Sequence, residues 1–69
     1  MARTIFTVAP KGEQWTLDEE LEGESERLEA GCSFERARDR AYRMGAQRTP
    51  SRIIILNAHG EIDTTRDFG

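Results

Sequence analysis

Cys32 and His59 are the side chains best suited to nucleophilic chemistry, and each is the only residue of its kind in the chain. A thiolate beside an imidazole makes a strong nucleophile. No motif brings the two together or orients either of them, and His59 lies between Ala58 and Gly60, as a polar turn residue would. We therefore expect no catalytic residue and a protein that is not an enzyme, with a small cysteine-dependent enzyme as the least favoured alternative.

The carboxylates gather in the segment 18–29, which contains seven of them. This segment lacks the alternating Asp/Asn pattern and central glycine of a calcium loop. A single cysteine allows neither a cysteine zinc site nor an intrachain disulfide. We expect no metal and no cofactor. Dense like charge favours an exposed segment, with a short edge strand near Arg27–Glu29, and a basic partner is the functional alternative.

Three arginines, Arg36, Arg40 and Arg43, recur at helical spacing and would fall within about 60° of one another on a helix. Asp39 precedes Arg43 by four residues, a spacing that favours an exposed ion pair. The net charge of −3 and the lack of interleaved aromatic residues are untypical of a nucleic-acid binder. We therefore take the three arginines as a candidate interaction surface, with nucleic acid as a less favoured partner than protein.

A helix over residues 33–44 must carry these arginines. Ser33 is a good N-cap residue, and Glu35 suits the first turn. Apolar residues recur along one face, and Gly45 predicts the end of the helix. The residues of this face are Phe34, Ala37, Ala41 and Met44.

Strands are predicted on both sides of the helix. Residues 4–9 and 14–18 form a hairpin around the turn Pro10–Glu13. After the helix, Ile53–Leu56 reads as a strand buried on both faces, and residues 57–60 turn into a last strand over 61–64. The predicted fold is a single α+β domain, residues 1–69, in which a small antiparallel sheet (β-β-(β)-α-β-β) carries one helix on one face.

The composition favours a partner chain. A domain of 69 residues, 36% apolar and 33% charged, has a thin core. The aliphatic run Ile53–Leu56 exceeds what one helix covers, so we expect a homodimer or another protein partner. So small a domain leaves little room for a cavity of about 300 Å³, and we expect no small-molecule substrate. Neither a signal peptide nor a membrane-spanning segment is evident, which favours a cytoplasmic protein without a membrane partner.

Short motifs along most of the chain resemble those of the small bacterial family catalogued as domain of unknown function two-one-eight-eight. The resemblance implies a small α+β fold and names no function. The matching residues are Phe6, Val8, Gly12, Trp15, Glu35-Arg36-Ala37-Arg38, Ile53-Ile54-Ile55, Gly60-Glu61-Ile62 and Phe68-Gly69. The acidic segment departs from the family pattern. A weaker, topological similarity to HicB-type antitoxins rests on Trp15, Gly31 and the helix from Ser33.

The function expected first is therefore a non-catalytic protein-interaction or regulatory module. The second is an antitoxin-like, nucleic-acid-associated regulator that uses the arginines of the helix.

Overall fold

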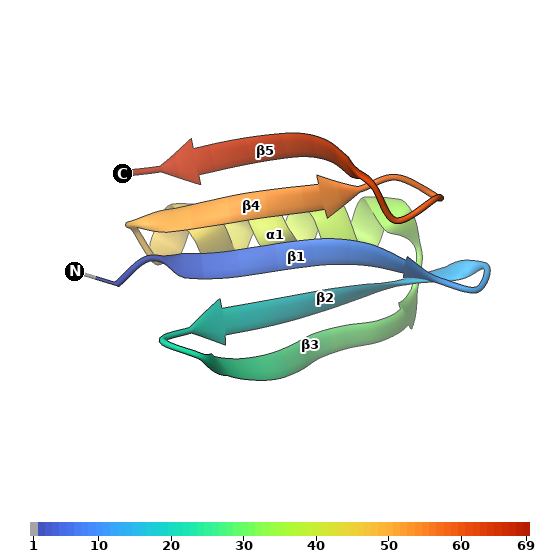
Figure 1. Cartoon of the computed structure of the whole chain (residues 1–69), viewed down its shortest axis with the longest axis horizontal. Helices are drawn as coiled ribbons and strands as arrows, with labels where there is room; N and C mark the ends of the chain where they lie inside the picture. Colours follow the sequence, from blue (N-terminus) through green and yellow to red (C-terminus); the bar gives the residue numbers. More distant parts are fainter. Residues whose placement is uncertain (1) are drawn as a thin grey trace.

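The computed structural model describes residues 2–69 and consists of one five-stranded sheet with a single helix packed on one face (Figure 1). The element order along the chain matches the predicted one, and the predicted α+β class is confirmed. The elements are β1 (Thr4–Lys11), β2 (Gln14–Leu21), β3 (Glu24–Cys32), α1 (Phe34–Gln47), β4 (Ser51–Leu56) and β5 (Ile62–Phe68).

The sheet is mixed, with strand order β3-β2-β1-β4-β5. Three neighbouring pairs are antiparallel, as predicted, but β1 and β4 are parallel. The reason is the length of α1. A helix of 14 residues is about 21 Å long, so it carries the chain from the end of β3 back along the sheet to the end where β1 begins (Figure 1). The strand that follows must then run in the direction of β1.

The core lies between α1 and the sheet. Alternate residues of β1 and β4 point toward the helix and are buried, because successive side chains of a strand point to opposite faces. The two alanines predicted on the apolar face of the helix are fully buried, so α1 lies close to the sheet. The buried apolar residues are Phe6, Val8, Leu17, Ala37, Ala41, Ile53 and Ile55.

Gly45 does not end the helix, and the prediction that it does is wrong. The helix continues to Gln47, with Arg48 as its C-cap. Gly45 is buried inside the last turn, where it faces β4. Its lack of a side chain therefore serves close packing between the helix and the sheet.

Ile53–Leu56 was expected to be buried on both faces or nearly so, and the structure buries it fully on one face only. Burial alternates along β4: Ile53 and Ile55 are buried against the helix, whereas Ile54 and Leu56 are half-buried. The single helix covers only one side of the sheet. We call the other side the open face. It displays the residues of β1 and β4 that alternate with the core positions.

The acidic segment is exposed, as expected, but it forms a long hairpin rather than containing one short strand. β3 has nine residues, and the turn from β2 places Glu22 and Gly23 at positive φ. Basic side chains relieve the repulsion among the carboxylates. Asp18 receives Arg27 at 2.9 Å from the neighbouring strand, and Glu19 receives Arg48 at 2.7 Å from the end of the helix.

Candidate functional site

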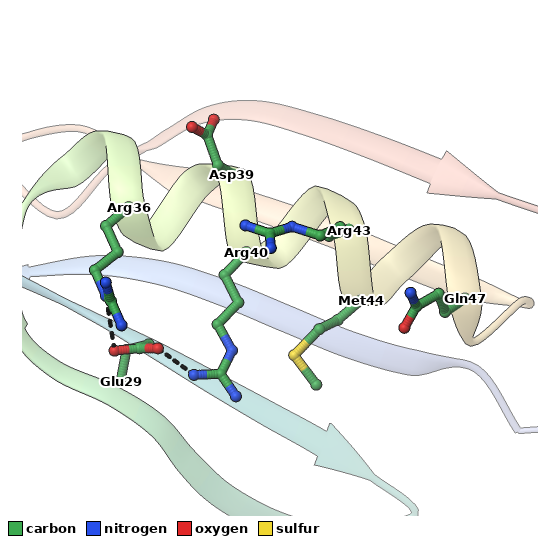
Figure 2. A pocket seen from close by; sticks show the side chains of 7 residues that line it. All are labelled: Glu29, Arg36, Asp39, Arg40, Arg43, Met44 and Gln47. Atoms are coloured by element: carbon green, nitrogen blue, oxygen red, sulfur yellow. Dashed lines mark hydrogen bonds and ion pairs between the residues drawn. The ribbon is translucent and has the colours of Figure 1, made fainter.

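The N-terminus of α1 is fixed by Ser33, as predicted. Its backbone is extended, with φ −74° and ψ 161°, and its side-chain oxygen accepts a hydrogen bond of 3.2 Å from the backbone N–H of Arg36. This cap sets where the helix begins and thus which side of it carries the arginines. Arg36 and Arg40 reach toward β3, as Figure 2 shows.

Glu29 of β3 joins two of the three arginines. One carboxylate oxygen accepts from Arg36 Nε at 3.3 Å, and the other accepts from a terminal guanidinium nitrogen of Arg40. The hydrogen bond from Arg40, supported by the one from Arg36, lowers the pKa of Glu29 against the opposing effect of burial. The side chain of Glu29 is only 11% exposed. It is therefore a shared counter-ion, held between strand and helix.

A β-bulge directs Glu29 to the helix. Leu17 of β2 pairs with Glu29, whereas the next residue, Asp18, pairs with Arg27, so β3 contains an extra residue at Leu28. Leu28 packs against the core and Glu29 contacts the helix, so both lie on the same side of the sheet. Strict alternation would have turned Glu29 to the open face. Sequence reasoning counted Glu29 only as one carboxylate among seven, because nothing local in the sequence marks this bulge.

Beside these ion pairs, α1 and β3 enclose a surface hollow of ≈ 540 Å³, which we call the arginine groove. Its lining residues are Glu29, Arg36, Asp39, Arg40, Arg43, Met44 and Gln47 (Figure 2). The three arginines of the predicted interaction surface all line this one hollow. The groove is an open surface hollow walled by long charged side chains outside the core, so the expectation of little room for a cavity of about 300 Å³ stays a prediction.

The ion pair expected between Asp39 and Arg43 is not among those formed by residues 2–69. Asp39 instead accepts from its neighbour Arg38 at 3.2 Å. Arg38 also lies over the ring of Phe34, with 5.5 Å from its guanidinium carbon to the ring centroid. This contact holds Arg38 near Asp39 and leaves Arg43, which is exposed, without a carboxylate among the described residues.

Cys32 and His59 do not form a pair. Cys32 ends β3, and His59 lies in the turn that follows β4. Two strands separate β3 from β4, which places them about 14 Å apart. The thiol of Cys32 donates to the carbonyl oxygen of Trp15 at 3.4 Å, and the backbone N–H of His59 donates to Asn57 Oδ1 at 2.8 Å. Both residues thus have local structural partners.

A second hollow, of ≈ 660 Å³, lies at the tip of the β2–β3 hairpin and is acidic. Its lining residues are Glu19, Leu21, Glu22, Glu24, Ser25 and Glu26. Within residues 2–69, no group of three His, Cys, Asp or Glu side chains is arranged to hold a metal ion. The one helix in this part of the chain lacks the length and apolar character needed to cross a membrane.

The open face combines aliphatic side chains with charges. Ile54 and Leu56 lie on it half-buried, and Ile62 of β5, which pairs with Leu56, is 66% exposed. At the end of the sheet where β1 begins, Ile5 lies between Glu20 of β2 and Arg52 of β4 in register. The aliphatic side chains of this face therefore lie mainly on β4 and β5, and Asp18, which pairs with Thr7, lies beside them. The row of charges at one end includes Asp67, which pairs with Arg52 at 2.7 Å.

Comparison of the chain with protein families, curated proteins and solved structures finds no match.

Proposed function

We propose that this chain is a non-catalytic protein-interaction module that works as a homodimer. The observation that supports the proposal is the open face of the sheet. Ile54, Leu56 and Ile62 lie together there, and no element of residues 2–69 covers them. A cluster of half-buried and exposed aliphatic side chains on a small domain is typical of a surface that binds protein. Covering it would add apolar burial to a thin core.

The charges on the open face favour a second copy as the partner. Glu20 and Arg52 flank Ile5 on opposite sides in one row across the sheet. When two such faces pack about a two-fold axis parallel to β1, the β2 side of one copy lies over the β4 side of the other. Glu20 of each protomer then stands opposite Arg52 of its partner, and Ile5 of each copy lies near the axis. This pair of charges is thus self-complementary, and Arg52 would be shared between Glu20 of the other copy and Asp67 of its own chain, with which it pairs at 2.7 Å.

The oligomeric state tests the proposal directly. We expect the wild-type protein to sediment as a dimer, and Ile62→Asp to raise the dimer dissociation constant about a hundredfold. Burial of one large aliphatic side chain contributes about 1.5–3 kcal/mol, and a two-fold dimer contains the substitution twice. Leu21→Asp is the matched control, since Leu21 is also exposed, at 43%, but belongs to the hairpin tip.

The two-fold arrangement has its own test. Glu20→Arg places two arginines opposite each other and is expected to weaken the dimer, more at low than at high salt. Glu13→Arg makes the same change of charge in the turn between β1 and β2 and should have little effect. A wild-type protein that stays monomeric at millimolar concentration, or a dimer that Leu21→Asp disrupts as strongly as Ile62→Asp, would contradict the proposal.

A further inference from the structure

The arginine groove already contains one bound carboxylate, which belongs to the chain itself. Arg36 holds one oxygen of Glu29 and Arg40 holds the other. Guanidinium groups pair with carboxylates through charge-assisted hydrogen bonds, which are shorter and stronger than neutral ones. The contacts of Glu29 therefore show that the arginines of this groove bind a carboxylate.

Arg43 offers the same chemistry one turn further along α1. Residues three apart on a helix have Cβ atoms about 5–6 Å from each other, so Arg43 lies beside Arg40. Arg43 is exposed, and residues 2–69 supply it with no carboxylate, because Asp39 is engaged by Arg38. Figure 2 shows its side chain running back along the helix toward the N-terminal end of α1, without reaching the Glu29 pair. The groove thus has one filled and one unfilled position for a carboxylate.

The remaining lining suits a segment of protein chain. Met44 adds a polarisable, adaptable apolar surface, and Gln47 adds an amide that both donates and accepts hydrogen bonds. The volume of ≈ 540 Å³ falls within the range of about 300–1,000 Å³ that is usual for ligand sites. A short extended segment with an acidic side chain would find a partner for its carboxylate, its apolar atoms and its backbone.

A nucleic acid fits this surface less well. Its many phosphates would meet a protein of net charge −3, and the acidic hollow of the β2–β3 hairpin adjoins the same strand. No aromatic side chain lines the arginine groove, so bases would have nothing to stack on. A short segment with a single carboxylate would contact only the basic surface around the arginines.

We propose that the arginine groove binds an acidic segment of a partner protein, with one carboxylate of that segment on Arg43. The groove lies on the helix side of the sheet, opposite to the open face. The inference is therefore independent of the proposed homodimer and would leave both surfaces free to act at once.

Fluorescence anisotropy with a labelled octapeptide of alternating glutamate and glycine tests the inference at low salt. We expect binding of this peptide and none of the same peptide with glutamine. Arg43→Gln should weaken binding about tenfold, the usual effect of losing one charge-assisted hydrogen bond. Lys11→Gln is the matched control, because it removes the same charge from an exposed residue outside the groove lining that forms no ion pair within residues 2–69. Circular dichroism checks that each variant is folded.

Glu29→Gln provides the opposite test. Removing the internal carboxylate frees Arg36 and Arg40, so the acidic peptide should bind about tenfold more tightly. Glu26→Gln changes the net charge equally on the same strand, outside the groove lining, and should change affinity far less. Damage to the fold would weaken binding, so tighter binding by Glu29→Gln would indicate a specific groove.

Three outcomes would overturn the inference. The first is equal weakening by Arg43→Gln and Lys11→Gln, which would indicate attraction by overall charge. The second is an unchanged affinity in Glu29→Gln. The third is tighter binding of a single-stranded or duplex oligonucleotide than of the peptide, which would assign the arginines to nucleic acid.

Discussion

Gly45 of α1 lies directly against Ile53 of β4, so closely that a Cβ atom on Gly45 would stand 2.6 Å from Ile53 Cδ1. The same Cβ would also stand 3.2 Å from Ser51 Oγ and from Phe68 Cδ2. Ser51 holds this contact in place, since its hydroxyl donates to the carbonyl oxygen of Gly45 at 2.7 Å. Helix α1 and strands β4 and β5 therefore meet at one glycine.

Gly45→Ala is expected to destabilise the protein, although alanine is the better helix former. Helix propensity alone would contribute about 1 kcal/mol in favour of the variant. The new methyl group must displace Ile53, which is fully buried, and overpacking of a close-packed core costs about 1–3 kcal/mol. We expect a net loss in the free energy of unfolding, measured by urea denaturation as a lower midpoint with an unchanged slope.

A double-mutant cycle isolates the contact. Ile53→Val removes the Cδ1 atom that the new methyl group would strike, so Gly45→Ala should cost less in that background than in the wild type. If the two substitutions are additive, the contact between Gly45 and Ile53 is not the cause of the loss.

Gly45 also shows where sequence reasoning fails for this fold. A glycine after an apolar helical pattern predicts a helix end, and only the position of Ile53, on another element, shows that it instead allows close packing. The β-branched strands and the Ser33 cap were predictable because their signals are local. The length of β3 was not predictable, because the carboxylates of the β2–β3 hairpin are tolerated through arginines on other elements. Asp18 and Glu19 of β2 receive Arg27 and Arg48, and Glu29 of β3 receives Arg36 and Arg40.

The candidate site likewise contains residues that the sequence predicted and one residue that it did not. Helical spacing alone brought Arg36, Arg40 and Arg43 to one side of α1. Their counter-ion, Glu29, was missed because its direction depends on the bulge at Leu28, which is set by the pairing of β3 with β2. The aliphatic residues of β4 indicated an uncovered surface. Which of them are uncovered followed only from the position of the helix on one side of the sheet.

Ser33→Ala should destabilise the protein by about 1 kcal/mol, because it removes the acceptor of the Arg36 N–H at the start of α1. Urea denaturation measures the loss. Ser33→Asp is the control, since its carboxylate can accept the same bond and suits the N-terminal end of the helix dipole. Equal destabilisation by both variants would show that the hydroxyl acts in some other way.

Acid should destabilise the fold through two carboxylates. The hydrogen bond from Arg40 lowers the pKa of Glu29 below its ordinary 4.5, and the one from Arg52 lowers the pKa of Asp67 below its ordinary 3.8. A carboxylate with a lowered pKa in the folded state contributes stability above its unfolded pKa and loses it as the pH falls through the folded value. The free energy of unfolding should therefore begin to fall below about pH 4.5 and continue to fall at lower pH.

Substitution of each carboxylate tests whether it causes this pH dependence. Glu29→Gln and Asp67→Asn should each make the fall in the free energy of unfolding with acid shallower, and high salt should reduce the difference, because both ion pairs are at the surface. Glu13→Gln, in the turn between β1 and β2, should follow the wild-type curve. If either variant has the same pH dependence as the wild type, the ion pair that it lacks does not cause that dependence.

Cys32 should react as a structural thiol. Its side chain is half-buried against the core and donates to the carbonyl oxygen of Trp15, so alkylation of the native protein by iodoacetamide requires local opening. We expect alkylation of the folded chain, followed by mass spectrometry, to be several-fold slower than that of the urea-unfolded chain. His59→Gln should leave the rate unchanged, because three strand spacings separate the strand of Cys32 from the one that precedes His59. Faster alkylation in the folded state, or a rate that depends on His59, would instead support a catalytic thiol.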